Sequence, residues 1–183
     1  MATKATNKKG KPAPPAPNVV EVATRGGPFE GASPVVLRRR AAKMLDHLAL
    51  SGVELSIALV DDATIHDLNR SYRHKDKPTD VLSFPLHERP AGWKPKGAKG
   101  AEIGAGWPYQ GPLGDVILSI DTARRQAAEQ GRPLLAELTM LLAHGLLHLV
   151  GYDHRTAAED REMTARTREL EAAASARTTT TPR

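Results

Sequence analysis

Three histidines in the last third of the chain have the type and spacing of a metal site. His144 and His148 stand at positions i and i+4, and His154 follows six residues later. On an α-helix, positions i and i+4 project from one face, about 6 Å apart along the axis. Two imidazoles in that arrangement can share one tetrahedral cation. The sequence therefore predicts a ligand pair on one helix, with the third ligand supplied from beyond the helix end.

Gly151 predicts a chain reversal between the second and third histidines. Glycine adopts positive φ without steric cost and is a common helix stop, so we expect His154 to swing back toward His144 and His148. Three neutral imidazoles with an open fourth position are the ligand set of a catalytic zinc, which lowers the pKa of its bound water to near 7. We expect one Zn²⁺ per chain, although three imidazoles also suit nickel or copper.

The competing interpretation is that these histidines are ordinary surface or core residues. It requires three coincidences: the i, i+4 spacing, the glycine stop, and a third histidine within reach. The two helical histidines also interrupt an otherwise apolar run, where burying a polar group without a partner costs roughly 2–7 kcal/mol. The metal interpretation is therefore favoured, whereas His66, His74 and His87 are isolated in the sequence and are predicted not to be ligands.

The same spacing, H-x-x-x-H-x-x-G-x-x-H, matches the long zinc-protease pattern except at one position. The glutamate that acts as general base in those proteases is Gly145 in this chain. A protease of that type without its glutamate lacks a proton acceptor, so the pattern predicts the metal geometry but not the peptidase machinery. Met163 follows nine residues after His154, and we expect it in the core rather than under the metal.

A second cluster of chemically informative residues precedes the third strand that the sequence predicts. Arg70, Arg73, Lys75 and Lys77 lie within eight residues, with Asp76 as the only acid among them. Such a charge run is often just a solvated loop, but arginine forks and lysine ammonium groups also bind phosphates. If this loop faces the metal, the expected chemistry is phosphodiester cleavage by metal-activated water. Arg73 would then neutralise the charge that develops in the transition state, and Arg70, Lys75 and Lys77 would bind RNA.

Three segments together resemble the bacterial YbeY family of endoribonucleases. They are LNRSYRHKDKPTDVLSFP (68–85), LGDVILSIDTARRQAAEQG (113–131) and HGLLHLVGYDH (144–154). The resemblance covers about residues 35–172, and the last segment joined to the first is highly specific.

The resemblance implies a zinc-dependent, single-strand-specific endoribonuclease that acts in 16S rRNA 3′-end maturation and ribosome quality control. The family's zinc ligands fall on His144, His148 and His154, and its functional arginine falls on Arg73. It also implies a small mixed sheet with packed helices and the zinc in a cleft. The implied partners are single-stranded and ribosomal RNA, the small ribosomal subunit and its assembly factors.

Two other functions stay open at this point. The chain could be a non-catalytic ribosome-assembly factor with a structural zinc, which normally has a fourth protein ligand. Asp153 could be that ligand, but we expect it to point away because it is adjacent to His154. The chain could also be a metal-dependent hydrolase of another substrate, and Gly145 disfavours the peptidase among these.

The elements that must position these residues alternate along the chain, which predicts a single α+β domain with layered helices and sheet. We expect a small mixed sheet of about four strands packed by about five helices. Periodicity, capping residues and glycine or proline stops predict strands at 19–22, 54–60, 80–85 and 115–120, and helices at 34–50, 62–72, 121–131, 133–149 and 156–173.

The charge of the chain is concentrated in its two ends. Residues 1–17 carry four lysines and no acid, whereas the 157 residues from 18 to 174 hold 20 basic and 21 acidic side chains. We therefore expect a disordered, basic, proline-rich arm at 1–17, the endoribonuclease domain at 18–174, and a disordered tail at 175–183. A long loop at 88–112, with its lysines and tryptophans, could contact RNA.

The composition excludes several classes of site. The chain has no cysteine, which excludes disulfides, thiolate zinc sites and a cysteine nucleophile. No apolar run approaches the ~18 residues of a membrane span. We expect no membrane partner and a cytoplasmic protein, because cysteine-free sequences fit a reducing compartment.

Overall fold

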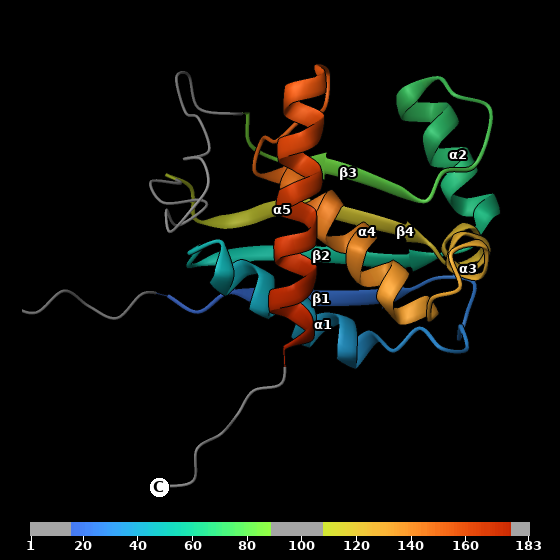
Figure 1. Cartoon of the computed structure of the whole chain (residues 1–183), viewed down its shortest axis with the longest axis horizontal. Helices are drawn as coiled ribbons and strands as arrows, with labels where there is room; N and C mark the ends of the chain where they lie inside the picture. Colours follow the sequence, from blue (N-terminus) through green and yellow to red (C-terminus); the bar gives the residue numbers. More distant parts are fainter. Residues whose placement is uncertain (1–15, 89–107, 177–183) are drawn as a thin grey trace, which may run out of the picture.

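The computed structural model describes residues 16–88 and 108–176, which form one mixed four-stranded sheet with helices packed on it (Figure 1). The strands follow the order β1-β2-β4-β3, with β1, β2 and β4 parallel and β3 antiparallel to β4. Their bounds are β1 Val19–Thr24, β2 Val53–Val60, β3 Val81–Pro85 and β4 Gly111–Ser119. The predicted α+β fold with a mixed sheet is confirmed.

Five helices in the described residues connect and cover these strands, and four of them begin at side-chain caps. Each cap residue accepts a hydrogen bond from a backbone amide of the first turn, which satisfies a group that the helix itself cannot pair. The caps are Ser33, Asp61, Ser119 and Thr156. The helices are α1 Pro34–His47, α2 Asp62–Arg73, α3 Ile120–Glu129, α4 Leu134–Leu149 and α5 Ala157–Ser175.

The main core lies between the sheet and helices α1, α4 and α5. Alternate residues of β2 are buried against these helices, including Leu55 and Ile57, and Met163 of α5 is 1% exposed in the same core. The second face of the sheet carries a smaller apolar cluster under α2, centred on Val60, Ile65 and Leu82. Helix α2 is therefore held mainly by one short apolar stripe, unlike α4.

Helix α4 is apolar on nearly every side because it lies between the sheet and its neighbours α3 and α5 (Figure 1). It approaches the sheet closely at Gly145. A Cβ atom there would lie 2.8 Å from Val116 Cγ1, 3.0 Å from Ser83 Oγ and 3.2 Å from Val81 Cγ2. The Ser83 hydroxyl also donates a hydrogen bond to the Gly145 carbonyl at 3.1 Å. Only glycine therefore fits this contact without displacing strand side chains.

Most boundaries lie within three residues of the predicted ones, and the main exception is the start of β4. The loop predicted to reach residue 112 ends sooner, because β4 begins at Gly111 rather than residue 115. Gly111 and Pro112 at this start are uncommon in strands, so the pattern did not predict it. Pro112 lies next to a register irregularity in the pairing with β2, where a missing amide is tolerated. Helix α5 reaches Ser175, the first residue of the predicted tail. Most of the predicted arm and tail (1–15, 177–183) and the loop core (89–107) lie outside the described residues.

No helix in residues 16–88 and 108–176 combines the length and the hydropathy that crossing a membrane requires. The most apolar helix, α4, has 16 residues, fewer than the approximately 20 that span a bilayer.

We predict that Gly145→Ala destabilises the fold by about 1–3 kcal/mol, because the added methyl group overpacks the contact with Val116. Helix propensity alone predicts the opposite sign, a gain of about 1 kcal/mol for alanine. Urea unfolding of the two proteins measures the difference. A more stable variant would show that the approach of α4 to the sheet is looser than described.

Candidate metal centre and cleft

The three predicted ligands, His144, His148 and His154, come together at the end of α4. One ring nitrogen of each can be chosen so that all three lie within 4.8 Å of one another. The ring centroids are 4.8 Å apart for His144 and His148, 5.2 Å for His148 and His154, and 5.7 Å for His144 and His154. Three imidazoles converging in this way form a donor set that suits a tetrahedral divalent cation.

The backbone after α4 folds back in the way the sequence predicts. Gly151 has φ +88°, and its amide donates to the His148 carbonyl at 3.0 Å. The Tyr152 amide donates to the Leu147 carbonyl, also at 3.0 Å, which completes the paired bonds of a Schellman motif. This reversal returns the chain toward the helix, and His154 joins the cluster three residues after the glycine.

The surroundings keep the imidazoles of His144 and His148 neutral, and a hydrogen bond fixes the orientation of the His148 ring. The Tyr152 carbonyl lies 3.0 Å from Nδ1 of His148, so Nδ1 donates and Nε2 keeps its lone pair for a metal. Burial, followed by the nearby His144, lowers the pKa of His148 to about 4. Burial and then His154 also lower the pKa of His144. Neutral imidazole is the form that binds metals, so this site fits a metal ion.

No fourth histidine, cysteine or carboxylate of the described residues joins the cluster. Asp153 is engaged elsewhere, because its carboxylate contacts Arg155 Nε at 2.5 Å and accepts the His154 amide at 2.9 Å. Burial alone would raise the pKa of Asp153, but these two partners outweigh it and lower the pKa. Within the described part of the chain the donor set therefore has three protein ligands and an open side.

A cleft of about 750 Å³ adjoins the histidine cluster and is also lined by Arg73. Arg73 is the last residue of α2, it is exposed, and no ion pair involves it among residues 16–88 and 108–176. In Figure 1, the end of α2 and the start of α5 both extend beyond β3, the edge strand of the sheet. The cleft residues are Arg73, Ser83, Pro85, Leu86, His87, Glu88, His148, Leu149, Gly151, Tyr152, Asp153, His154, Arg155 and Glu159.

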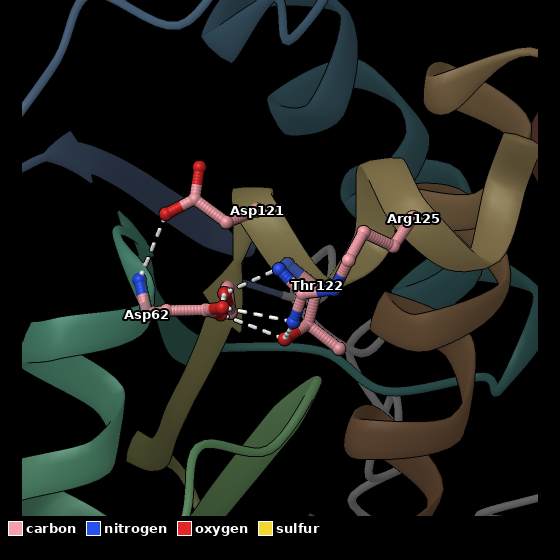
Figure 2. A network of polar contacts seen from close by, with 5 residues as sticks. Asp62, Asp121, Thr122 and Arg125 are labelled. Atoms are coloured by element: carbon pink, nitrogen blue, oxygen red, sulfur yellow. Dashed lines mark hydrogen bonds and ion pairs between the residues drawn. The ribbon is translucent and has the colours of Figure 1, made fainter.

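Helix α2 is anchored at its other end by a polar network that Figure 2 shows. The Asp62 carboxylate accepts hydrogen bonds from Ser119 Oγ at 2.5 Å, Thr122 Oγ1 at 2.7 Å and an Arg125 guanidinium nitrogen at 2.8 Å. Asp121 accepts the Asp62 amide at 3.0 Å. Burial alone would raise the pKa of Asp62, but these donors lower it. The network holds the start of α2 on the C-terminal ends of β2 and β4.

Asn69 fixes the turn that follows Arg73, a role that the sequence analysis missed. It is 1% exposed, its side-chain Nδ2 donates to the Lys77 carbonyl at 2.7 Å, and its backbone carbonyl accepts the Lys75 amide at 3.3 Å. The signal in the sequence was a polar residue, Asn69, on the buried side of α2, four residues after Ile65. The turn itself begins with His74 in the left-handed region, at φ 55°.

The other predicted RNA-binding residues lie near Arg73 but outside the lining of the cleft. The Arg70 guanidinium pairs with Asp67 at 2.8 Å, and the Lys75 and Lys77 side chains are exposed on the turn. The structure thus brings one of the four predicted basic residues to the cleft, and the role of Arg70, Lys75 and Lys77 in RNA binding stays a prediction. His87, predicted not to be a ligand, is absent from the cluster but lines the cleft.

Comparisons with known proteins agree with this geometry. The family model described as Endoribonuclease YbeY matches residues 35–174. A Myxococcus xanthus protein named Endoribonuclease YbeY is 52% identical over 125 residues, which are 68% of this chain and 38% of that protein. A Persephonella marina protein of the same name is 42% identical over 127 residues, 69% of this chain and 73% of that protein.

A solved structure shows the same fold. The solution structure of TM1509 from Thermotoga maritima has a TM-score of 0.56 and 23% identity, and the match covers 85% of this chain and 89% of that one. At this identity the likeness concerns the fold alone. The family match covers the sheet from β2 onward, the end of α2 and the whole histidine cluster. The chain therefore belongs to the YbeY family of endoribonucleases.

Proposed function

We propose that this chain is a metal-dependent endoribonuclease that cleaves phosphodiester bonds in the cleft beside its histidine cluster. The observation that carries the proposal is the meeting of His148 and His154 in one open cleft with Arg73, which has no ion pair among the described residues. The family's name supports an RNA substrate. A metal donor set beside a cation is the combination that hydrolysis of an anionic phosphodiester requires.

The residues that would hold the ion are His144, His148 and His154, and we propose one zinc ion per chain. Zinc supplies Lewis-acid activation of water at neutral pH. The chain contributes the neutral state of the two helical imidazoles and the orientation of His148 by the Tyr152 carbonyl. It also leaves one side of the donor set open to the cleft.

Arg73 would bind the phosphate and neutralise the charge that gathers on its oxygens during cleavage. A guanidinium group can make two parallel hydrogen bonds to a phosphate. Because Arg73 has no carboxylate partner in the described residues, its charge is available to a substrate. The nearby cation Arg155 is instead paired with Asp153.

The finer function follows from the family resemblance. We propose that the substrate is single-stranded RNA, that the natural target is the 3′ end of 16S rRNA, and that the protein takes part in ribosome quality control. Its partners would then be the small ribosomal subunit and assembly factors, and its location the cytoplasm. The cleft is compatible with such a substrate because Arg73, His148 and His154 line one space of about 750 Å³.

The two alternatives are less well supported. A structural zinc in a non-catalytic assembly factor would need a fourth ligand, and the described residues provide none. A peptidase of the zinc-protease type needs a glutamate at position 145, where even a Cβ atom would contact Val116 and Ser83. The side chain at this position would point into the sheet, so the position cannot provide a base to the cleft.

We predict that the wild-type chain binds one equivalent of zinc and that His148→Ala loses it. Zinc at about 100 times its dissociation constant should stabilise the wild type by about 2.7 kcal/mol. Metal content by mass spectrometry and melting temperature with and without chelator measure both effects. His47→Ala is the control, because His47 pairs with Glu169 away from the cluster. Equal zinc content in wild type and His148→Ala would refute the ligand assignment.

Arg73→Ala should lower kcat of RNA cleavage about 10²- to 10³-fold, the usual cost of removing one donor that stabilises transition-state charge. The assay is cleavage of an end-labelled single-stranded RNA by zinc-loaded protein. Arg39→Ala, an exposed change on α1, is the control. If both variants cleave at the wild-type rate, the assigned role of Arg73 is wrong. If wild type and variants bind zinc but never cleave, the assembly-factor alternative gains weight.

The three exposed residues of the same region should behave differently from Arg73. Changing Arg70, Lys75 and Lys77 together to alanine should raise KM, leave kcat nearly unchanged, and weaken the salt dependence of RNA binding. Titrations at several salt concentrations measure that slope. An unchanged slope would show that these side chains do not contact the RNA backbone.

The metal-free protein should lose stability as the pH falls from about 6.5 to about 4. The pKa of His148 is near 4 in the folded chain and near 6.5 when unfolded. Between these values the unfolded chain takes up a proton that the folded chain does not, so acid favours unfolding. Urea midpoints across this range should fall more steeply for the wild type than for His148→Gln. Parallel curves would mean that the folded site does not exclude the proton.

A further inference from the structure

His87 lines the cleft, although it belongs neither to the histidine cluster nor to the basic turn after α2. It lies two residues after β3, in the segment that continues from Ser83 and Pro85 along the same cleft. Among the described residues it is the only histidine besides His148 and His154 that lines this space. Its side chain is half-buried.

The imidazole of His87 stacks on the aromatic ring of Tyr109. Its ring and that of Tyr109 are parallel to within 3°, with centroids 4.2 Å apart. Tyr109, just before β4, is not one of the residues that line the cleft. One face of the imidazole is therefore covered by Tyr109, while His87 contributes to the lining of the cleft.

Hydrogen bonding does not account for this arrangement. The Nε2 atom of His87 is buried and has no hydrogen-bond partner among the described residues. Among the described residues, the stack with Tyr109 is the ring contact of His87, and the Tyr109 hydroxyl also donates to the carbonyl of the next residue, Glu88, at 3.5 Å. A phenylalanine at position 87 could stack on Tyr109 in the same way. The variant His87→Phe therefore keeps the ring face and removes the ring nitrogens.

We propose that the His87–Tyr109 stack is a platform on which one base of single-stranded RNA stacks while the adjoining phosphate lies between Arg73 and the histidine cluster. This inference rests on the proposed function and adds a specificity-determining contact to it. Bases of single-stranded RNA are free to splay out and stack on aromatic rings, including histidine. Stacking tolerates any base, because every base has a flat π-face. A base inside a duplex is already stacked on its neighbours, so the platform would favour single strands.

The test measures binding of a short fluorescein-labelled single-stranded RNA to the full chain without metal, so that cleavage does not interfere. His87→Ala should weaken binding roughly 5- to 150-fold, the range measured for loss of one base–aromatic stack. His87→Phe should stay within about twofold of wild type, because it keeps the ring face. His47→Ala, on α1 outside the cleft, is the control.

A set of RNAs that each carry one abasic residue identifies the stacked base. At one position the abasic change should weaken binding to wild type but have no further effect on His87→Ala, which is the signature of a direct pair in a double-mutant cycle. With zinc-loaded protein, His87→Ala should raise KM and leave kcat nearly unchanged, because the stack is present in both ground and transition states.

Three results would overturn the platform: unchanged binding by His87→Ala, a loss by His87→Phe as large as that by His87→Ala, or the absence of any coupled abasic position. Melting temperatures of the variants show whether a loss reflects misfolding, and His87→Phe tests the ring in a side chain of similar shape. Failure of the proposed function would look different. In that case zinc-loaded wild type would neither bind nor cleave the RNA.

Discussion

The close packing of α4 against β3 and β4 at Gly145 is the constraint on which the rest of the structure depends. One helix has to supply much of the core and also present two polar imidazoles. It does so because the side without a Cβ meets Val116 and Ser83, while His144 and His148 project from another side to meet His154, and His148 also lines the cleft. A larger residue at 145 would either displace the strand side chains or move the helix off the sheet, and a moved helix would shift the cluster relative to Arg73.

Partial burial of the imidazoles is a cost that a metal ion would offset. Burial lowers the pKa values of His144 and His148, so both rings stay neutral where an exposed histidine would be partly protonated. Without a cation, the convergence of three imidazoles leaves their lone pairs without a ligand and gains little free energy. With a cation the same convergence satisfies their lone pairs, and binding would couple to the stability of the end of α4.

The sequence alone predicted the parts of the site whose geometry is local. The i, i+4 spacing and Gly151 specify His144, His148 and His154 within eleven residues, since helix geometry and one glycine turn relate them. The predicted fold class rested on equally local periodicity. The meeting of Arg73 with the cluster depends on tertiary packing of α2, which periodicity does not encode. His87 was missed as a cleft residue for the same reason, and its partner Tyr109 lies across a long segment of chain.

Strand β3 explains why these distant segments meet at one open cleft. It is an edge strand of the described sheet, antiparallel to β4, and joins the turn after α2 to the segment that holds His87. An exposed edge normally invites another strand, but β3 has five residues and ends in Pro85, which cannot donate to a ladder. Ser83 and Pro85 line the cleft. The short strand and Pro85 thus disfavour pairing of this edge with another β-strand. The edge still lines the cleft, where an extended single strand of RNA could lie along it.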